Sequence, residues 1–419
     1  MVMSSSRFPP GPRPTVAVVS DYALDYTGGA QTAMVAECRS LVQAGVRVLL
    51  VVPRSATPLP LDGIELHPLP APRIPVVQLP IVRNSRRTRA LLTALFRDEQ
   101  VGTVHVHSEF GLAVAALEVA ARLGIPSVAT VHTFFWRGAP GLVGRLVAPI
   151  AAAHVAAVTG RRPRLPRGGD DRLGELLRDV TRSAAGRADL VISPSAHQAE
   201  ALRRTGLARV AVLPNTVIPR AAGADEEAGR AGETPGPLRL LWVGRCAPEK
   251  RLVPFLEGCL AVLAREPGAL TVEVIGSGPS LARAVRLAAG CPAVVFRGFV
   301  ENGRIGDAVR RSDLVALTSF GFDNQPMVVV EALQGGRGIL YVDPALTEGL
   351  DGPGLLAPVE PAAFAAYLER LCRDRAPARA ASAAAREAFA DFAPEAHASA
   401  LLALHAAARE HAGLRSAGE

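Results

Sequence analysis

The sequence predicts an α/β protein built from two doubly wound domains, each with a parallel sheet covered by helices. Apolar segments of strand length alternate with helical segments along nearly the whole chain, and this alternation is typical of parallel sheets. It restarts after 218–237, a linker rich in Ala, Gly, Glu and Pro without apolar periodicity. The length of 419 residues suits two domains of ordinary size. The predicted parts are a disordered tail (1–14), an N-terminal domain (15–217), the linker (218–237), a C-terminal domain (238–393), and a last helix and tail that can cross back to the N-terminal domain (394–419).

Composition and charge describe a soluble globular chain with a basic first half. Hydrophobic residues make up 49% and charged residues 20%, which argues against disorder. Residues 1–217 hold 25 Arg against 15 acidic residues, a net charge of +10, whereas 218–419 hold 20 Arg, one Lys and 24 acidic residues, a net charge of −3. A basic half suggests an anionic partner such as a lipid surface or a phosphorylated substrate, and solubility explains it equally well. We expect no nucleic-acid partner.

Neither a metal cluster nor a membrane span is expected. The five cysteines are odd in number and form no CxxC pair, so we predict reduced thiols. No long apolar run precedes the first strand, and no 18-residue stretch is both apolar and uncharged. The nearest is Gly141–Val158, interrupted by Arg145 and Pro149, which we interpret as a helix pair packed into the protein or lying on a lipid surface. We expect a cytoplasmic protein, with peripheral association at the inner face of a membrane as an option.

The N-terminal half opens with a βαβ unit. A strand at Thr15–Ser20 leads through a loop carrying Gly28 and Gly29 into a helix at about Gln31–Ala44. A helix amino terminus presents free N–H groups that suit a phosphate, although a tight turn needs glycine as well. The segment Pro53–Pro80 is predicted to be an irregular sheet edge. The other strands predicted in this half are Val46–Val52, Thr103–His107, Ser127–Val131, Asp189–Ser193 and Val210–Leu213.

Histidines stand at the carboxyl ends of two predicted strands. His132 follows Ser127–Val131, and ligands of doubly wound sheets bind off the carboxyl ends of the strands. We therefore favour a functional role for His132 over a structural one. For His105, His107 and Glu109, at the end of the neighbouring strand, the two interpretations are balanced.

The C-terminal half repeats the pattern around an unusual lysine. Lys250 is the only lysine among 46 basic residues and lies with Arg245 in a strand-to-helix loop. A compact ammonium kept where the chain otherwise uses arginine favours phosphate binding over chance survival. Two cations there would neutralise a diphosphate and its charge as a leaving group. The strands predicted in this half are Leu238–Val243, Thr271–Ile275, Ala293–Phe296, Leu314–Leu317 and Ile339–Val342.

Two carboxylates follow the strand Leu314–Leu317. Asp323 lies in the polar loop Thr318–Met327, and Glu331 lies eight residues later in the following helix. Both can face a crevice off the end of the sheet. Taken alone, the pair could equally be a loop aspartate and a solvated helix glutamate.

Taken in order, the motifs GGAQTAM, TVHTFF, SPSAHQAEAL, VLPNTV, VGRCAPEKR, IGSGP and FRGFV and the Asp323/Glu331 pair resemble the family 4 glycosyltransferases. The resemblance covers about residues 15–400, and the segment around TVHTFF is also similar to bacterial diacylglycerol glucosyltransferases and, less closely, phosphatidylinositol mannosyltransferases. It implies the GT-B fold, in which two Rossmann-like domains face each other across a cleft. It also implies a retaining reaction with front-face departure of the diphosphate and no metal or other cofactor.

The resemblance implies roles for individual residues. Arg245, Lys250 and the Gly29 backbone would bind the donor diphosphate, Glu331 the ribose, and Asp323 the donor sugar, which His132 would face. Residues Arg297–Phe299 would lie near the base, the donor-sugar loop would include Asn324, Gln325 and Met327, and the acceptor side would include His107 and Glu109.

The chain departs from the family pattern in the loop before Glu331. Asp323 stands where glutamate is usual, so its carboxylate is one methylene shorter. Pro326 replaces a residue whose backbone N–H would be available, because proline has no N–H; the side chains of Asn324 and Gln325 would donate instead. These departures bear on the identity of the donor sugar more than on activity.

Three functions remain open from the sequence. The favoured one is a transferase that moves a hexose from a nucleotide diphosphate sugar to an acceptor on the basic N-terminal domain. That acceptor is a membrane-associated lipid or, as the runner-up, a small soluble metabolite or sugar phosphate. The second is a non-catalytic nucleotide-sugar-binding protein, and the third, a two-domain dehydrogenase, is disfavoured because no GxGxxG fingerprint follows the first strand.

Overall fold

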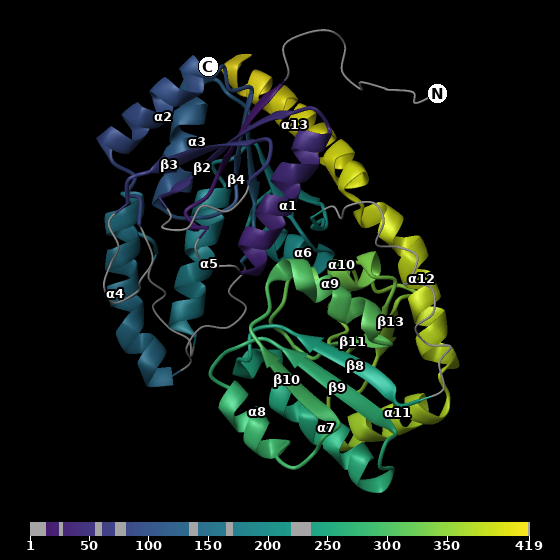
Figure 1. Ribbon diagram of the computed structural model, residues 1–419. Coiled ribbons are helices and arrows are strands. Elements are labelled where there is room, and N and C mark those ends of the chain that lie inside the picture. Colours follow the sequence, from purple (N-terminus) through teal and green to yellow (C-terminus); the bar gives the residue numbers. More distant parts are fainter. Residues whose placement is uncertain are drawn as a thin grey trace, which may run out of the picture. The chain divides into compact units, whose positions relative to one another are not determined.

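The computed structural model describes residues 14–24, 28–54, 61–71, 81–133, 141–164, 171–218 and 236–417. The chain divides into two compact units (Figure 1). Unit 1 comprises Met1–Pro219 and Pro394–Glu419, and unit 2 comprises Arg220–Ala393. The last helix therefore belongs to the unit that begins the chain.

Unit 1 is a parallel sheet of seven strands in the order β3-β2-β1-β4-β5-β6-β7. Its strands are β1 (Thr15–Val19), β2 (Arg47–Pro53), β3 (Ile64–Leu69), β4 (Thr103–Val106), β5 (Ser127–Thr130), β6 (Leu190–Ser193) and β7 (Val210–Val212). Its helices are α1 (Gly29–Gln43), α2 (Arg86–Asp98), α3 (Gly111–Leu123), α4 (Gly141–Thr159), α5 (Arg172–Ala185), α6 (Ala196–Arg204) and α13 (Pro394–Ala417).

Helices cover both faces of this sheet. Because successive side chains of a strand point to opposite faces, each strand contributes to two cores. Val16 and Val18 of β1 pack with α1 and α13 in one core, whereas Ala17 and Val19 pack with α2, α3 and α6 in the other. Helix α13, the yellow helix of Figure 1, lies beside α1 and contributes Leu401 to the first core. The C-terminal helix thus completes the packing of the N-terminal sheet.

Unit 2 is a parallel sheet of six strands in the order β10-β9-β8-β11-β12-β13. Its strands are β8 (Leu238–Val243), β9 (Leu270–Ile275), β10 (Val294–Gly298), β11 (Leu314–Leu317), β12 (Gly338–Tyr341) and β13 (Gly354–Leu356). Its helices are the 3-10 turn η2 (Pro248–Lys250), α7 (Leu252–Arg265), α8 (Leu281–Leu287), α9 (Asn302–Arg311), α10 (Met327–Gln334), α11 (Pro361–Arg373) and α12 (Ala376–Phe392). Each unit is therefore doubly wound, and the predicted fold class is confirmed.

Two local predictions need correction, and two elements were not predicted. The segment predicted as an irregular sheet edge does lie at the edge, but it contains the regular strand β3, which pairs with β2 over six residues. The predicted helix pair is the single helix α4, which continues through the exposed Pro149. Strand β13 and helix α5 were missing from the prediction: β13 has only three residues, and α5 follows a stretch whose Pro and Gly residues predicted only a loop.

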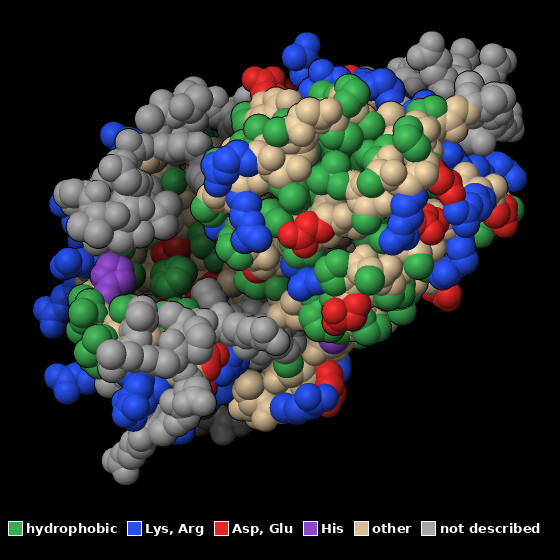
Figure 2. Space-filling model, turned by 90° about the horizontal axis from the view of Figure 1, so that it is seen from below, with side chains coloured by type: hydrophobic (Ala, Val, Ile, Leu, Met, Phe, Trp, Pro, Cys, Tyr) green, Lys and Arg blue, Asp and Glu red, His purple; other side chains and the backbone are tan. Residues whose placement is uncertain are grey.

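Two further observations concern the charge of the surface and the composition of the helices. On the face that Figure 2 shows, Lys and Arg side chains are spread among hydrophobic and acidic ones and do not form one continuous basic stripe. Such a stripe is the usual electrostatic footprint of nucleic-acid binding. Among the described residues, no helix has both the length and the apolar composition that a membrane crossing requires.

Candidate active site

In unit 2, backbone hydrogen bonds join the loop that carries Arg245 and Lys250 to the segment that follows β9. The N–H of Cys246 donates to Ser277 O at 2.8 Å, and its carbonyl accepts from Ser280 N at 2.7 Å. A Cβ at Gly278 would lie 2.6 Å from the Cys246 carbonyl oxygen, so this close approach requires glycine. The neighbouring GSGP segment therefore positions the cationic loop.

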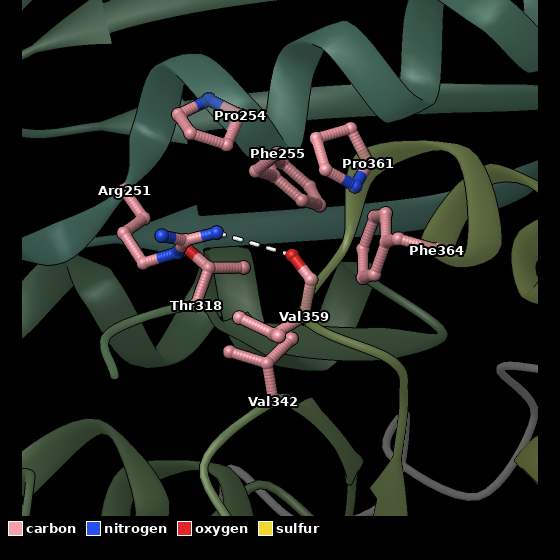
Figure 3. Close-up of a pocket in the computed structure, with 8 residues that line it drawn as sticks. All are labelled: Arg251, Pro254, Phe255, Thr318, Val342, Val359, Pro361 and Phe364. Atoms are coloured by element: carbon pink, nitrogen blue, oxygen red, sulfur yellow. Dashed lines mark hydrogen bonds between the residues drawn. The ribbon is translucent and has the colours of Figure 1, made fainter. Parts of the chain in front are cut away.

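The end of the same loop is held in a strained conformation. Arg251 has a φ of +56°, unusual for a residue other than glycine. Its guanidinium donates to the carbonyl of Val359 at 3.1 Å, across a small pocket between α7, the ends of β11 and β12, and the start of α11 (Figure 3). None of the predicted site residues lines this pocket, so we assign it to the support of the loop rather than to substrate.

Lys250 and Asp323 meet although they are 73 residues apart. Lys250 Nζ lies 2.5 Å from Asp323 Oδ1, and the hydroxyl of Ser319 donates to the other carboxylate oxygen. Thr318 Oγ1 donates to the Lys250 carbonyl at 2.8 Å and accepts from the buried indole N–H of Trp242 at 3.0 Å. The pair thus stands on the ends of β8 and β11, where ligands of such sheets bind.

Arg245 lies in the same loop in a more open setting. Its side chain is 56% exposed, against 23% for Lys250, and it pairs with Glu249 four residues later. Both cations therefore have carboxylate partners within unit 2. An incoming diphosphate would compete with those carboxylates for the same charges.

The polar loop leads directly into α10, which begins at Met327 after Pro326. Proline suits this position, because the first N–H groups of a helix have no partner within it. The helix amino terminus and Asp323 thus lie within four residues of each other, and Gln325 between them is buried. Glu331 is the fifth residue of the helix and is half-buried.

The segment predicted to lie near the base is partly engaged elsewhere. Arg297 donates to Glu273 at 3.0 Å, whereas Phe299 is 66% exposed. An exposed aromatic ring can stack on a planar ligand.

In unit 1, His132 follows β5 and is joined to His107, which follows β4. His132 Nε2 lies 2.8 Å from His107 Nδ1, and His107 Nε2 lies 3.0 Å from Glu37 Oε1 of α1. Burial, with His107 beside it, lowers the pKa of His132 to about 3. His132 is therefore a neutral imidazole at physiological pH.

Glu37 was missing from the predicted site, although it holds the centre of this region. His105 Nδ1 lies 3.1 Å from the same Glu37 oxygen. Burial opposes ionisation of Glu37, but His105 and His107 together hold its pKa well below the usual range. The ligand atoms of Glu37, His105 and His107 lie within 4.8 Å of one another, so these residues could hold a metal ion. Position 37 reads as an ordinary polar helix residue, and only the fold reveals its histidine neighbours.

Glu109 lies in a second buried acidic group, with Asp21 and Tyr22. The Asp21 carboxylate accepts from the backbone N–H groups of Leu112 at 2.7 Å and Ala113 at 3.2 Å and thereby caps α3. Tyr22 Oη lies 3.4 Å from Glu109 Oε2, and the other oxygen of Glu109 is buried without a hydrogen-bond partner among the described residues. Burial and the nearby Asp21 raise the pKa of Glu109 to about 8, so it is an uncharged acid at neutral pH.

Gly29 is the first residue of α1, and Gly28 before it has no side chain to cap the helix. The first N–H groups of α1 therefore lack a side-chain acceptor at the capping position, which suits an anion there.

Comparison with known proteins assigns both units. The sequence profile of Glycosyltransferase Family 4 matches residues 27–220, and that of Glycosyl transferases group 1 matches residues 237–374. The chain belongs to the family 4 glycosyltransferases. The predicted family is thus confirmed, and the protein is a glycosyltransferase that uses a nucleotide sugar.

Relatives of this glycosyltransferase include two curated proteins and many solved structures. It is 28% identical over 358 residues to a GDP-mannose-dependent alpha-mannosyltransferase of Mycobacterium tuberculosis (82% of this chain, 84% of the relative) and 26% identical to one of Mycolicibacterium smegmatis (again 82% and 84%). Sucrose-phosphate synthase from Thermosynechococcus elongatus matches with a TM-score of 0.64 at 18% identity, covering 94% of this chain and 98% of that one. Anabaena HepE in complex with UDP and glucose matches with a TM-score of 0.62 at 16% identity, covering 93% and 98%. These structures show the GT-B fold class of the two units.

The residues predicted to form the site thus fall into two groups. Unit 2 brings together Lys250, Asp323 and the start of α10, with Arg245 in the same loop as Lys250. Unit 1 brings His107 and His132 into one hydrogen-bonded cluster with the unpredicted Glu37, and Glu109 into contact with the equally unpredicted Tyr22. Asp21 and Tyr22 left no sequence signal beyond their place just after the first strand.

Proposed function

We propose that this protein is a retaining hexosyltransferase that transfers a hexose from a nucleoside diphosphate sugar to a membrane lipid. The observation that carries the proposal is the contact of Lys250 with Asp323 beside the amino terminus of α10. A cation for phosphate and a carboxylate for sugar hydroxyls then stand at one sheet edge. GDP-mannose is the first candidate donor, because both curated relatives are named for it.

In this reaction the diphosphate is the leaving group. Arg245 and Lys250 bind its oxygens, and Gly29 of unit 1 contributes backbone N–H groups. Glu331 accepts from the ribose hydroxyls, and Asp323, with Asn324, Gln325 and Met327 in its loop, holds the sugar. The bond from the anomeric carbon to the phosphate oxygen breaks, and a new one forms to the acceptor oxygen on the same face. The acceptor proton passes to the departing phosphate oxygen.

His132 acts from unit 1 as a neutral group toward the sugar, and His107 and Glu109 lie on the acceptor side. Because two side-chain cations balance the charge of the leaving group, we propose that the reaction needs no metal. Activity that survives prolonged EDTA treatment would support this proposal, and activity restored only by added Mg²⁺ or Mn²⁺ would contradict it.

The donor can be identified by a thermal-shift screen over GDP-, UDP-, ADP- and TDP-sugars. A ligand that binds only the folded state raises the melting temperature by an amount that grows with the ratio of its concentration to its Kd. We expect the largest shift with GDP-mannose. NMR of the product's anomeric proton then tests retention, because an inverted anomer would contradict the mechanism.

The lipid acceptor is supported by the surface of α4. Leu146 and Ile150, one helical turn apart, are 64% and 72% exposed, and Val147 between them is 39% exposed. The exposed Arg145 lies beside this apolar face, and three more exposed arginines follow the end of the helix: Arg161, Arg162 and Arg164. An apolar helix face bordered by arginine is typical of helices that lie on anionic membranes.

Liposome flotation tests the acceptor class. We expect the wild type to float with vesicles containing phosphatidylglycerol, and L146D/I150D to stay at the bottom. Val285→Asp is the matched control, because Val285 is 44% exposed on α8 of unit 2 and its replacement should leave flotation unchanged. If the wild type transfers sugar but does not float, the runner-up acceptor, a small soluble metabolite or sugar phosphate, replaces the lipid.

A further inference from the structure

Five of the nine histidines belong to one cluster around Glu37, and four of them are buried whereas His132 is half-buried. They come from two strand ends and the C-terminal helix: His105, His107, His132, His397 and His405. The site described above uses only His107 and His132, which leaves a buried carboxylate and three imidazoles unexplained. A buried charge without partners is costly, so such a group persists only when its hydrogen bonds are well organised.

The hydrogen bonds of this cluster determine where each proton sits. An ionised carboxylate only accepts, so the His107 Nε2 that faces Glu37 Oε1 at 3.0 Å carries a hydrogen. In the arrangement that we infer, His107 carries only this hydrogen, so its Nδ1 is an acceptor. The His132 Nε2 that faces this Nδ1 at 2.8 Å must donate, which leaves Nδ1 of His132 as the acceptor nitrogen. The tautomers thus follow in one direction from Glu37 to His132.

We propose that Glu37 and His107 are positioning residues that fix the tautomer and the ring orientation of His132. The inference rests on the proposed role of His132 toward the donor sugar. A buried acid that orients an imidazole through its second nitrogen is a general device of catalytic sites. Here a second imidazole, that of His107, stands between the carboxylate and the oriented imidazole of His132. The carboxylate comes from α1 and not from a strand end.

Helix α13 covers Glu37, at the buried end of this series of hydrogen bonds. His397 Nε2 lies 3.5 Å from Glu37 Oε2, and His405 Nε2 lies 3.4 Å from His105 Nδ1. His397 is anchored in turn, because its Nδ1 lies 2.9 Å from the carbonyl oxygen of Pro214. The C-terminal helix therefore shields the Glu37 carboxylate from water. Glu37 begins the series of hydrogen bonds through His107 to His132, which we call the relay.

Histidine ¹⁵N NMR of the wild-type protein tests the inference directly, because ring nitrogens with and without a hydrogen have distinct shifts. We expect His107 and His132 both to carry the hydrogen on Nε2. In Glu37→Gln the amide NH2 can donate to His107 Nε2, and the hydrogens of both rings would then move to Nδ1. A wild-type His132 with its hydrogen on Nδ1 would overturn the proposal.

Kinetics provide the second measurement. Glu37→Gln and His107→Gln should lower kcat roughly 10- to 100-fold with a small change in the KM for the donor, as is usual when a supporting residue is lost. Thr130→Val is the matched control, because Thr130 Oγ1 lies 2.7 Å from His105 Nε2 in the same cluster but outside the path to His132. We expect its kcat within threefold of the wild type.

Two further outcomes bear on the proposal separately from the proposed function. Elemental analysis that finds one metal ion per chain, lost in Glu37→Gln and in His105→Gln, would overturn the relay, because the ion would take the place of the protons. A wild type with the expected tautomers but without transferase activity would contradict the proposed function and leave the relay intact. If Glu37→Gln does not fold, the wild-type spectrum still decides.

Discussion

The two groups of site residues differ in how they are held. In unit 1, His132 belongs to a buried cluster of hydrogen bonds that starts at Glu37, and burial keeps its ring neutral. In unit 2, Lys250 and Arg245 are partly exposed, and each pairs with a carboxylate that a substrate phosphate could replace. We therefore expect the unit 1 group to be organised before the substrate arrives, and the unit 2 group to exchange partners when the substrate binds. This difference predicts where substitutions damage affinity and where they damage turnover or folding.

The largest effect is expected at Lys250. Lys250→Ala should lower kcat/KM for the donor at least about 100-fold, because one preorganised group facing the leaving-group charge typically contributes that much. Lys250→Arg should recover only part of the loss, since a planar guanidinium does not replace a point charge. Steady-state kinetics and calorimetry with the donor measure both. Full activity of Lys250→Ala would contradict the proposal that this loop binds the donor diphosphate.

Asp323 should be the next most sensitive residue. Asp323→Ala removes the side chain proposed to bind the sugar, which lowers kcat/KM. It also frees Lys250 for the diphosphate, which partly offsets that loss, and we expect a net fall of about 30-fold. The variant should bind the nucleoside diphosphate itself no more weakly than the wild type, because a competitor for Lys250 is gone. Calorimetry with GDP and with the intact donor separates the two. Weaker binding of GDP would contradict the exchange of partners.

In unit 1, Glu109 should change stability as a function of pH. Its folded-state pKa of about 8 lies above the unfolded value of 4.5, so it contributes stability that is full below pH 4.5 and lost as the pH rises through 8. The slope is on the order of 1 kcal/mol per pH unit within that window. Glu109→Gln, which mimics the uncharged acid, should remove this slope from urea unfolding curves. If the free energy of unfolding depends on pH equally in the wild type and in Glu109→Gln, a group other than Glu109 binds the proton.

The smallest effect is expected at Glu249, which pairs with Arg245 on an exposed loop. Glu249→Gln should tighten donor binding about threefold, because an exposed ion pair contributes less than about 1 kcal/mol and its loss frees the guanidinium. Glu257→Gln on the neighbouring α7 is the matched control for the change of net charge. A weaker donor affinity in Glu249→Gln would show that Glu249 orients Arg245 instead of competing for it.

The sequence by itself determined the fold class, and it named the candidate residues of unit 2 and part of those in unit 1. Alternating apolar segments predict two parallel sheets, and these sheets place residues such as His132, Lys250 and Asp323 at strand ends, where ligands bind. Position within a βαβ unit is a local property, so it can be read without the fold. The same local signal failed at β3 and α4, where proline residues suggested breaks that the backbone accommodates at an edge and on an exposed helix.

Only the tertiary structure decided which groups share protons and charges. Glu37, His105 and His405 lie in α1, β4 and α13, up to 368 positions apart, yet they form one buried cluster because α1 and α13 pack side by side on the same face of the sheet. Lys250 meets Asp323 because β8 and β11 are neighbours in the sheet of unit 2 although they are not consecutive in the chain. A titratable group takes its pKa and its partners from the surrounding space, and no spacing along the sequence encodes them.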